Sequence, residues 1–383
     1  MASPEILDFD RLLAAISDEE PAGPELKDDS EQMKVYYQIK DAREAARTAE
    51  RQLAQAALYG DDEEVSSISP PDWKQVLDLG VDAIAEKSKD LWIASWLIEA
   101  AARRHGFAGL RDGFRLAREM SERFWEGIHP RPDEDGYATT VAQLAGLNGE
   151  DSEGALITPI DTIPITQGTT DRPLTSGDYK QAADLEQMSD PDRRAQRIEQ
   201  GAISMQAFER AANETPPEFF HNLHEDIQQC IDEFAKLEEV LDERCGKNED
   251  GYSAAPPTSN IRNSLDECRG RVKSIARHVL DAGPDGAEVE SGDLATVPGE
   301  TQVAVGAGKV VTREDAFRAL LQVADFFRRT EPHSPVSYAL EQAVRWGRMP
   351  LPELMADLIA DESTREEMYR RVGIPKPNSS END

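Results

Sequence analysis

The chain has 383 residues, of which 42 are lysine or arginine and 75 are aspartate or glutamate, so its formal net charge is −33. A surface this acidic repels phosphate backbones and anionic lipid headgroups, which disfavours nucleic acid and membranes as partners. Solubility alone would account for the charge, and a specific basic partner is the alternative. With 39% apolar residues the chain can bury a core, and its length is typical of two or three domains.

The cysteines and the hydropathy pattern indicate a cytoplasmic protein. Cys230, Cys245 and Cys268 fit neither a paired-cysteine metal motif nor a disulfide framework, which favours a reducing compartment. The first residues lack the basic and apolar regions of a signal peptide. No stretch approaches the roughly 18 apolar residues of a membrane span, so we expect no membrane insertion.

Residues 1–165 predict a first helical domain. Ser3 followed by Pro4 is typical of an N-cap with proline at the first helical position, which predicts a short helix there. The sequence Pro-Ala-Gly-Pro at 21–24 predicts a turn. The polar, alanine-rich segment 30–59 has high helix propensity and a weak apolar face, so it is either a partly exposed helix or a docking surface.

Three further helices complete this predicted domain. Asp72, with Gln75 three residues later, predicts a capping box at the start of a helix that opens with Trp73. Apolar residues at helical spacing predict a second helix over 91–105 and a third from about 110 to 125. We expect these helices to stack in antiparallel order.

Residues 178–281 predict a middle helical domain. The preceding segment, 158–177, is interrupted by proline, threonine and glycine, which predicts a linker that packs on its neighbours. Helices are expected near 195–213, 217–244 and 259–280. The helix over 217–244 carries apolar residues at steps of three and four, a pattern that serves either the core of its own bundle or self-association.

The remaining residues predict a tether and a small third domain. Residues 282–309 are glycine-rich, acidic and almost free of large side chains, which predicts a flexible linker. Thr312 and Asp315 resemble a capping box at the start of a C-terminal helical domain over 310–374. Residues 375–383 are expected to be a disordered tail.

No pattern in the chain predicts catalysis. The sequence Gly-Ala-Gly-Lys at 306–309 resembles the end of a phosphate loop, but Val303 and Val310 occupy the positions where that loop needs glycine and serine or threonine. His221 and His224 could share a helix face, yet a metal site needs a third ligand and the zinc-protease spacing is absent. We therefore predict a protein that is not an enzyme and that has no cofactor and no metal.

An ordered series of motifs in the first 165 residues carries a family resemblance. The series runs from the Pro-Ala-Gly-Pro turn through Pro-Asp-Trp at 71–73 and Lys-Asp-Leu at 89–91 to Phe-Trp-Glu-Gly-Ile-His-Pro at 124–130. Together these motifs resemble the ImpA N-terminal domain of TssA proteins, which are components of the bacterial type VI secretion system. The sequence departs from the family at Ala22, where many members have cysteine. The residues to which the resemblance gives a structural role are Pro21, Gly23, Asp72, Trp73, Asp90, Leu91, Trp125, His129 and Pro130.

The C-terminal region resembles the shorter type of TssA protein. The resemblance lies in Arg-Arg-Thr-Glu-Pro-His-Ser-Pro-Val at 328–336, Ala-Val-Arg-Trp-Gly at 343–347 and Leu-Pro-Glu-Leu at 351–354. In that family the C-terminal part forms rings, whereas the N-terminal part contacts other components of the apparatus. Large apolar groups in so short a domain either fill its own core or mediate oligomerisation. The candidate oligomer contacts are Phe326, Phe327, Tyr338, Trp346 and Leu351.

The sequence therefore predicts an all-α, multi-domain protein of antiparallel helical bundles, with a flexible acidic linker before a small C-terminal helical domain. The resemblance implies a homo-oligomeric component of type VI secretion that acts in baseplate and sheath-tube assembly by binding baseplate, sheath, tube or membrane-complex proteins. The alternative is a monomeric helical adaptor or chaperone for another complex. The identity of the bound components and the number of subunits are left open by the sequence.

Overall fold

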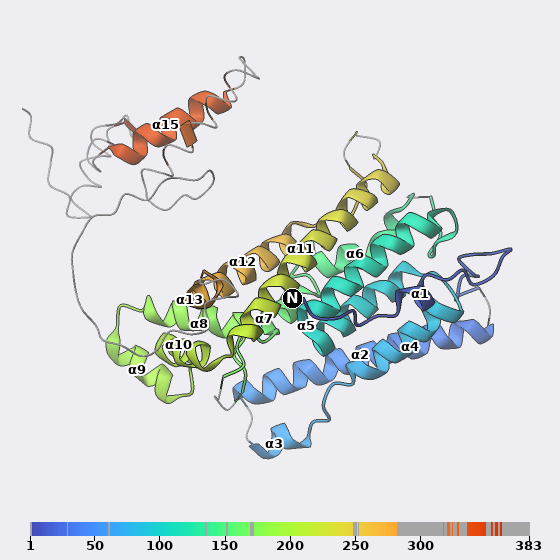
Figure 1. Cartoon of the computed structure of the whole chain (residues 1–383), viewed down its shortest axis with the longest axis horizontal. Helices are drawn as coiled ribbons and strands as arrows, with labels where there is room; N and C mark the ends of the chain where they lie inside the picture. The colour runs from blue at the N-terminus through green and yellow to red at the C-terminus, as the bar shows by residue number, and fades with distance from the viewer. Residues whose placement is uncertain are drawn as a thin grey trace, which may run out of the picture. The chain divides into compact units, whose positions relative to one another are not determined.

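The computed structural model describes residues 2–281 except 29, 60–61, 135, 151, 169–171, 248–250 and 252, together with 335–349 and single positions between 317 and 361. The chain divides into two compact units, residues 1–289 and 290–383. Within the described residues the elements are helices, joined by turns and a few isolated β-bridges, and there is no strand (Figure 1). The predicted all-α class is confirmed.

The first helix begins later than the sequence indicated. Helix α1 spans Phe9–Leu12, and the carboxylate of Asp8 caps it by accepting a hydrogen bond from the Arg11 amide at 3.1 Å. The prediction that Ser3 is the N-cap is wrong. Residues 2–6 are not helical, because Ser3 bonds to a distant carboxylate, as described below.

Helices α2, α3 and α4 span Ser30–Tyr59, Asp62–Ser67 and Trp73–Glu86. The bounds of α2 match the predicted helix, and α2 packs along α4. The Asp72 cap of α4 is confirmed, since the carboxylate of Asp72 accepts a hydrogen bond from the Gln75 amide at 3.0 Å.

Helix α5, Leu91–Phe124, is the central element of the first unit. It packs against α4, α6 (Ala138–Asn148) and α11 (Pro217–Cys245), so residues on nearly all of its faces are buried. The two helices predicted for this stretch join end to end at Gly106, whose φ of 58° and ψ of −138° interrupt the helical geometry. This conformation disfavours any residue with a Cβ atom.

The predicted linker over 158–177 contains one element that the sequence did not indicate. A short helix, α7, spans Ile157–Thr162, and an isolated bridge then joins Pro164 to Thr175 before α8 begins. The apolar residues of the segment pack on the core, as predicted. Those buried residues are Ile160, Ile163, Ile165 and Leu174. Helix α8 then spans Ser176–Glu186.

A single helix over 195–213 is the second wrong expectation. The structure has two helices there, α9 over Pro191–Glu199 and α10 over Met205–Glu214. Gly201, with a φ of 95°, follows α9, and the hydroxyl of Ser204 caps α10 by accepting a hydrogen bond from the Ala207 amide at 3.2 Å. A left-handed glycine followed by an N-cap serine is a stop and a start signal that the sequence analysis missed.

Helix α11 packs its apolar stripe inside the first unit. Its neighbours are α5, α12 (Ser259–Ile275) and α13 (Arg277–Leu280), and the Phe114 and Phe234 rings lie 4.7 Å apart between α5 and α11. The stripe therefore serves the core of this chain. Its buried residues are Phe220, Leu223, Ile227, Phe234, Leu237 and Leu241.

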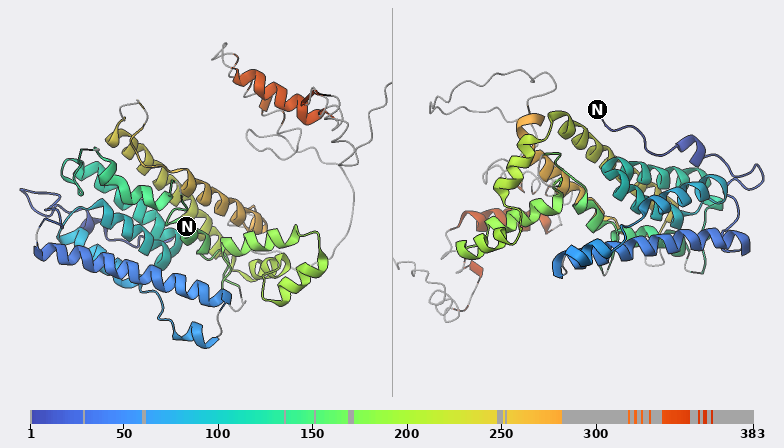
Figure 2. Two further views of the ribbon diagram at one scale, coloured as in Figure 1. Left: turned by 180° about the vertical axis from the view of Figure 1, so that it is seen from behind. Right: turned by 90° about the horizontal axis from the view of Figure 1, so that it is seen from below.

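The packing of α11 on α5 joins residues 1–165 and 178–281, predicted as separate domains, in one hydrophobic core. Figure 2 shows the two helices side by side from two further directions. The predicted linker over 282–309 and the tail over 375–383 lie outside the described residues.

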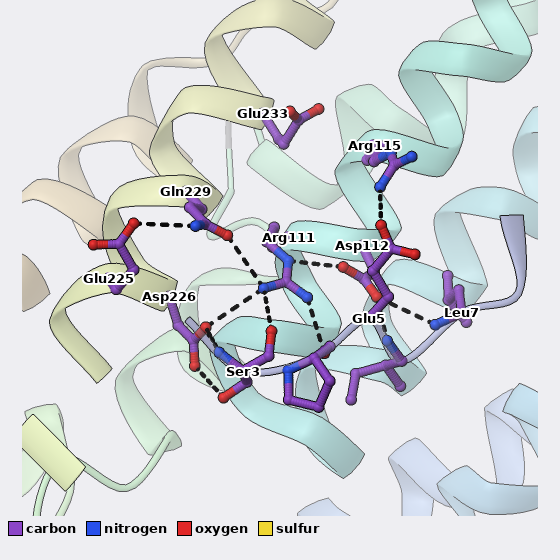
Figure 3. A network of polar contacts seen from close by, with 12 residues as sticks. Ser3, Glu5, Leu7, Arg111, Asp112, Arg115, Glu225, Asp226, Gln229 and Glu233 are labelled. Atoms are coloured by element: carbon purple, nitrogen blue, oxygen red, sulfur yellow. Dashed lines mark hydrogen bonds and ion pairs between the residues drawn. The ribbon is translucent and has the colours of Figure 1, made fainter. Parts of the chain in front are cut away.

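The guanidinium of Arg111, on α5, fixes the N-terminal segment to the bundle (Figure 3). Its two Nη atoms donate hydrogen bonds to the carbonyl oxygens of Ser3 and Pro4 at 2.9 and 3.1 Å. Its Nε atom donates to Asp112 at 2.8 Å, and Nη1 lies 3.5 Å from the Asp226 carboxylate on α11. All three charged side chains are buried.

The two carboxylates of this network also hold the N-terminal segment directly. Asp226 accepts hydrogen bonds from the amide and the hydroxyl of Ser3 at 2.8 and 2.6 Å. Asp112 accepts from the amides of Ile6 and Leu7 at 2.5 and 3.2 Å. These contacts explain why the segment stays extended where a helix was predicted.

We predict that Arg111→Met lowers the free energy of unfolding by about 3 kcal/mol, because Asp112 and Asp226 would remain buried without their cation. Urea unfolding followed by circular dichroism would measure the change. The matched control is Arg11→Met, which removes two exposed ion pairs, with Asp82 and Glu86, and should lower the stability far less than Arg111→Met does. Equal losses of stability for the two variants would mean that the buried Arg111 network stabilises the fold no more than the exposed ion pairs do.

In the second unit the structure describes one continuous helix, α15, over Val336–Arg348. Ser337 and Val344 are buried on it, whereas Tyr338 is 63% exposed.

Candidate interaction surface

Three backbone segments that are distant in sequence meet where α5 begins. The Lys89 amide donates a hydrogen bond to the carbonyl of Ala22 at 2.7 Å. The His129 amide donates to the Lys89 carbonyl at 2.9 Å, and the Leu91 amide donates to the His129 carbonyl at 2.8 Å. We call this meeting point the motif junction, because it brings together the turn after α1, the start of α5 and the loop after α5.

The imidazole of His129 closes the junction from inside. Its Nε2 atom lies 2.8 Å from the carbonyl oxygen of Gly23, so Nε2 carries the proton and donates. Gly23 has a φ of 70°, and a Cβ atom built on it would lie 2.4 Å from the carbonyl oxygen of Lys87. Only glycine fits this position. The adjacent peptide bond between His129 and Pro130 is cis, and Pro21 lies exposed at the edge of the turn.

Asp90 fixes the first turn of α5 to the junction. Its buried carboxylate accepts hydrogen bonds from the amides of Trp92 and Ile93 at 2.7 and 3.3 Å, which is N-cap geometry. Burial raises the pKa of Asp90 above its ordinary value. The side chain of Leu91 is completely buried beside it.

Lys89 is a fully buried lysine at the centre of the junction. Its Nζ atom donates hydrogen bonds to the carbonyls of Leu12 and Ile84 at 2.7 and 2.8 Å, near the ends of α1 and α4. Burial lowers the pKa of Lys89 to about 8. A single amine therefore satisfies carbonyls of two helix ends and fixes α1 and α4 to the start of α5.

The part of the junction that faces solvent is the turn over 131–137. Trp125, buried in the short 3₁₀ helix η1 (Trp125–Gly127), packs on Tyr137 with ring centroids 4.7 Å apart. Asp133 and Gly136 exchange two backbone hydrogen bonds, and the Thr139 hydroxyl donates to the Asp133 carboxylate. The turn is thus an exposed, acidic loop on a rigid base. Its exposed residues are Arg131, Pro132, Asp133 and Glu134.

Asp72 and Trp73 lie apart from the junction, where α4 begins. The indole Nε1 of Trp73 donates to the Glu50 carboxylate of α2 at 2.6 Å. The Arg103 guanidinium of α5 lies 3.9 Å from the Trp73 ring centroid and donates to the same carboxylate at 2.7 Å. This cluster joins α2, α4 and α5.

Two of the five candidate oligomer contacts lie within the described residues. Tyr338 is exposed on α15, and Trp346 is half-buried, with its Nε1 atom donating to the Asp357 carboxylate at 2.6 Å. Phe326, Phe327 and Leu351 lie outside the described residues.

The described residues hold no constellation for catalysis that we can identify. Among them, no group of three or more histidine, cysteine, aspartate or glutamate side chains could hold a metal ion. Burial raises the pKa values of the Cys245 and Cys268 thiols to about 11, so both are protonated at neutral pH. No helix in the described part of the chain has the length and apolar character needed to cross a membrane.

Comparison with known proteins shows which proteins this chain resembles. Residues 13–149 match the family model described as ImpA, N-terminal, type VI secretion system. The chain is 25% identical over 366 residues to the type VI secretion system component TssA1 of Pseudomonas aeruginosa PAO1, a match that covers 95% of this chain and 98% of that protein.

A solved structure has the same fold. It is the N-terminal domain, including the conserved ImpA_N region, of the TssA component of the type VI secretion system from Burkholderia cenocepacia. The TM-score is 0.57 at 23% identity, covering 71% of this chain and 94% of that one.

These similarities define a helical protein with an ImpA N-terminal region, and the motif junction lies inside the matched residues. The chain belongs to the TssA family of type VI secretion system components.

The sequence analysis missed the charged residues that hold this region together. Lys89 belongs to the Lys-Asp-Leu motif, and Glu99, Arg111 and Asp112 lie within the predicted helices, where the apolar spacing assigns them no role. A signal was present, because charged residues inside a stretch that is apolar on two stripes must find buried partners.

We predict that the stability difference between the wild type and Lys89→Met widens as the pH rises. The pKa of Lys89 is about 8 in the folded state and 10.5 ordinarily, so the protonated amine opposes folding. The folded protein therefore gains stability as the pH rises from about 8 towards 10.5. Wild type should gain about 2 kcal/mol relative to the variant between about pH 7 and pH 9.5.

Urea unfolding at the two pH values would measure this change. Lys87→Met, which alters an exposed lysine two residues away, is the control and should show no such widening. A constant difference for Lys89→Met would mean that the amine is not desolvated.

Proposed function

We propose that this protein is a non-enzymatic assembly component of a cytoplasmic type VI secretion machinery, acting in baseplate and sheath-tube assembly through contacts with other apparatus proteins. The observation that carries the proposal is the end-to-end similarity to TssA1, which covers 95% of this chain and 98% of that protein. The architecture is consistent with it, because the motif residues form a buried scaffold beneath an exposed turn, an arrangement suited to binding.

We further propose that the C-terminal region, residues 310–374, self-associates and presents several copies of the N-terminal region. Large apolar side chains in a short domain favour oligomerisation, and the exposed Tyr338 is consistent with this. A ring of copies would convert weak individual contacts into avid binding. The acidic segment 282–309 would then set the reach of each N-terminal region.

We predict that the full chain forms a large oligomer and that a chain ending at Asp281 is monomeric, because residues 2–281 supply one complete hydrophobic core without the second unit. Light scattering after size exclusion would measure both masses. A monomeric full chain would exclude the ring and would favour a monomeric adaptor. An oligomeric truncation would move the self-association into residues 1–281.

We predict that deletion of the gene abolishes type VI secretion and that the wild-type chain restores it. The readout is the amount of secreted tube protein in the medium, with the protein retained in cells as the expression control. Restoration by a chain ending at Asp281 would argue against a role for self-association. Unchanged secretion after deletion would refute the proposed function.

A further inference from the structure

One face of α2 points away from the bundle and takes no part in the motif junction. Met33 and Tyr37 lie one turn apart on it, and Arg47 and Arg51 follow at helical spacing, within about 40° of the same line along the helix. Helix α2 lies along the outer edge of the first unit (Figure 2). We call these four residues the α2 face.

The first half of the α2 face is apolar. Met33 is 36% exposed and Tyr37 is 49% exposed. Among the described residues up to 281, the other large apolar side chain exposed to this degree is Ile198, on α9. Isolated exposed apolar residues are ordinary, but two adjacent ones on a helix form a small contact patch.

The second half of the α2 face lies in a group of described residues where arginines outnumber carboxylates. Two further arginines, Arg43 of α2 and Arg103 of α5, lie near this half of the face. Both pair with the buried Glu99, and Arg103 also pairs with Glu50. Those two carboxylates thus offset the charges of Arg43 and Arg103. Arg47 lies close to the same three charged groups, Arg43, Arg103 and Glu99.

No ion pair or hydrogen bond joins the half-buried Arg47 side chain to another described residue. Burial and the nearby Arg43, Arg103 and Arg51 lower its pKa, against the attraction of the Glu99 carboxylate. Arg51 donates to the Thr48 hydroxyl at 3.2 Å and has no carboxylate partner among the described residues. Among the described residues, neither arginine is hydrogen-bonded to a carboxylate, and Glu99, which attracts Arg47, is already paired with Arg43 and Arg103.

We propose that the α2 face binds an acidic amphipathic helix of a partner protein. The apolar side chains of that helix would pack on Met33 and Tyr37, and its carboxylates would pair with Arg47 and Arg51, where bidentate contacts favour arginine. The inference rests on the proposed function, since it names the kind of partner that one surface of an assembly component would bind.

The dimensions and the charge both favour such a partner. From Met33 to Arg51 the face is about 27 Å long, the length of a helix of about five turns. Between the two halves, Lys40 and Glu44 are 3.8 Å apart and neutralise each other. The rest of the surface is acidic, since the net charge of the chain is −33. It still disfavours nucleic acid, whose charge density is far higher and which offers no apolar stripe to Tyr37.

The test uses the full-length protein and a fluorescein-labelled helical peptide of about 20 residues, with leucines along one half of a face and glutamates along the other. Fluorescence anisotropy measures binding. The same peptide with lysines in place of glutamates, a 20-base oligothymidine and anionic vesicles of phosphatidylglycerol are the competing ligands.

We expect Arg47→Glu with Arg51→Glu to weaken binding of the acidic peptide by about tenfold or more, and Tyr37→Ser to weaken it several-fold. The matched control is Arg193→Glu with Arg197→Glu, two exposed arginines at the same four-residue spacing on α9, which should change binding by less than about twofold. Arg51→Glu alone alters an exposed side chain that, among the described residues, bonds to Thr48. It serves as a second variant should the double change disturb folding.

The proposal is overturned if wild type binds the acidic peptide no better than its lysine version, if the α2 variants bind like wild type, or if oligothymidine or vesicles bind more tightly than the peptide. Secretion separates this proposal from the proposed function. If deletion abolishes secretion while the α2 variants restore it fully and bind the peptide normally, the α2 face alone is refuted; if deletion leaves secretion intact, the proposed function is refuted whatever the peptide does.

Discussion

The burial of α5 on nearly all sides is the constraint on which the rest of the first unit depends. This helix carries charged residues into the core, and each must find a partner there because an unpaired buried charge is costly. Glu99 pairs with Arg43 of α2, and Arg111 with Asp226 of α11 and the carbonyl of Ser3. Charge neutralisation around one helix therefore helps to fix where α2, α11 and the N-terminal segment pack.

The local part of this fold could be predicted from the sequence, and the long-range part could not. Helix α2 and the Asp72 cap follow from propensity and from a hydrogen bond between residues three apart. Ser3 failed as a cap because its partner, Asp226, lies 223 residues away in the chain. The same limit hid the shared core, since the two predicted domains are joined by packing between helices far apart in the chain, chiefly that of α11 on α5.

The motif residues illustrate a different limit. Their order in the chain is enough to carry a family resemblance, but it does not indicate what each residue does. The hydrogen bond from His129 to the Gly23 carbonyl and the pair from Lys89 to Leu12 and Ile84 are visible only in three dimensions. These side chains are buried, so the contacts that the structure shows for them are structural, joining the ends of α1 and α4 and the loop after α5 to the start of α5.

Two exposed surfaces of the first unit then differ in sign. The turn that contains Asp133 and Glu134 is acidic, whereas the α2 face presents Arg47 and Arg51 beside an apolar patch. Both are attached to α5, the turn through its C-terminal end and α2 through the Glu99 and Glu50 ion pairs. Because the two surfaces belong to one packed core, a partner with complementary charges would bind in one orientation. A fixed orientation would suit the proposed assembly role, because it depends on the spacing of the two charged surfaces on one core.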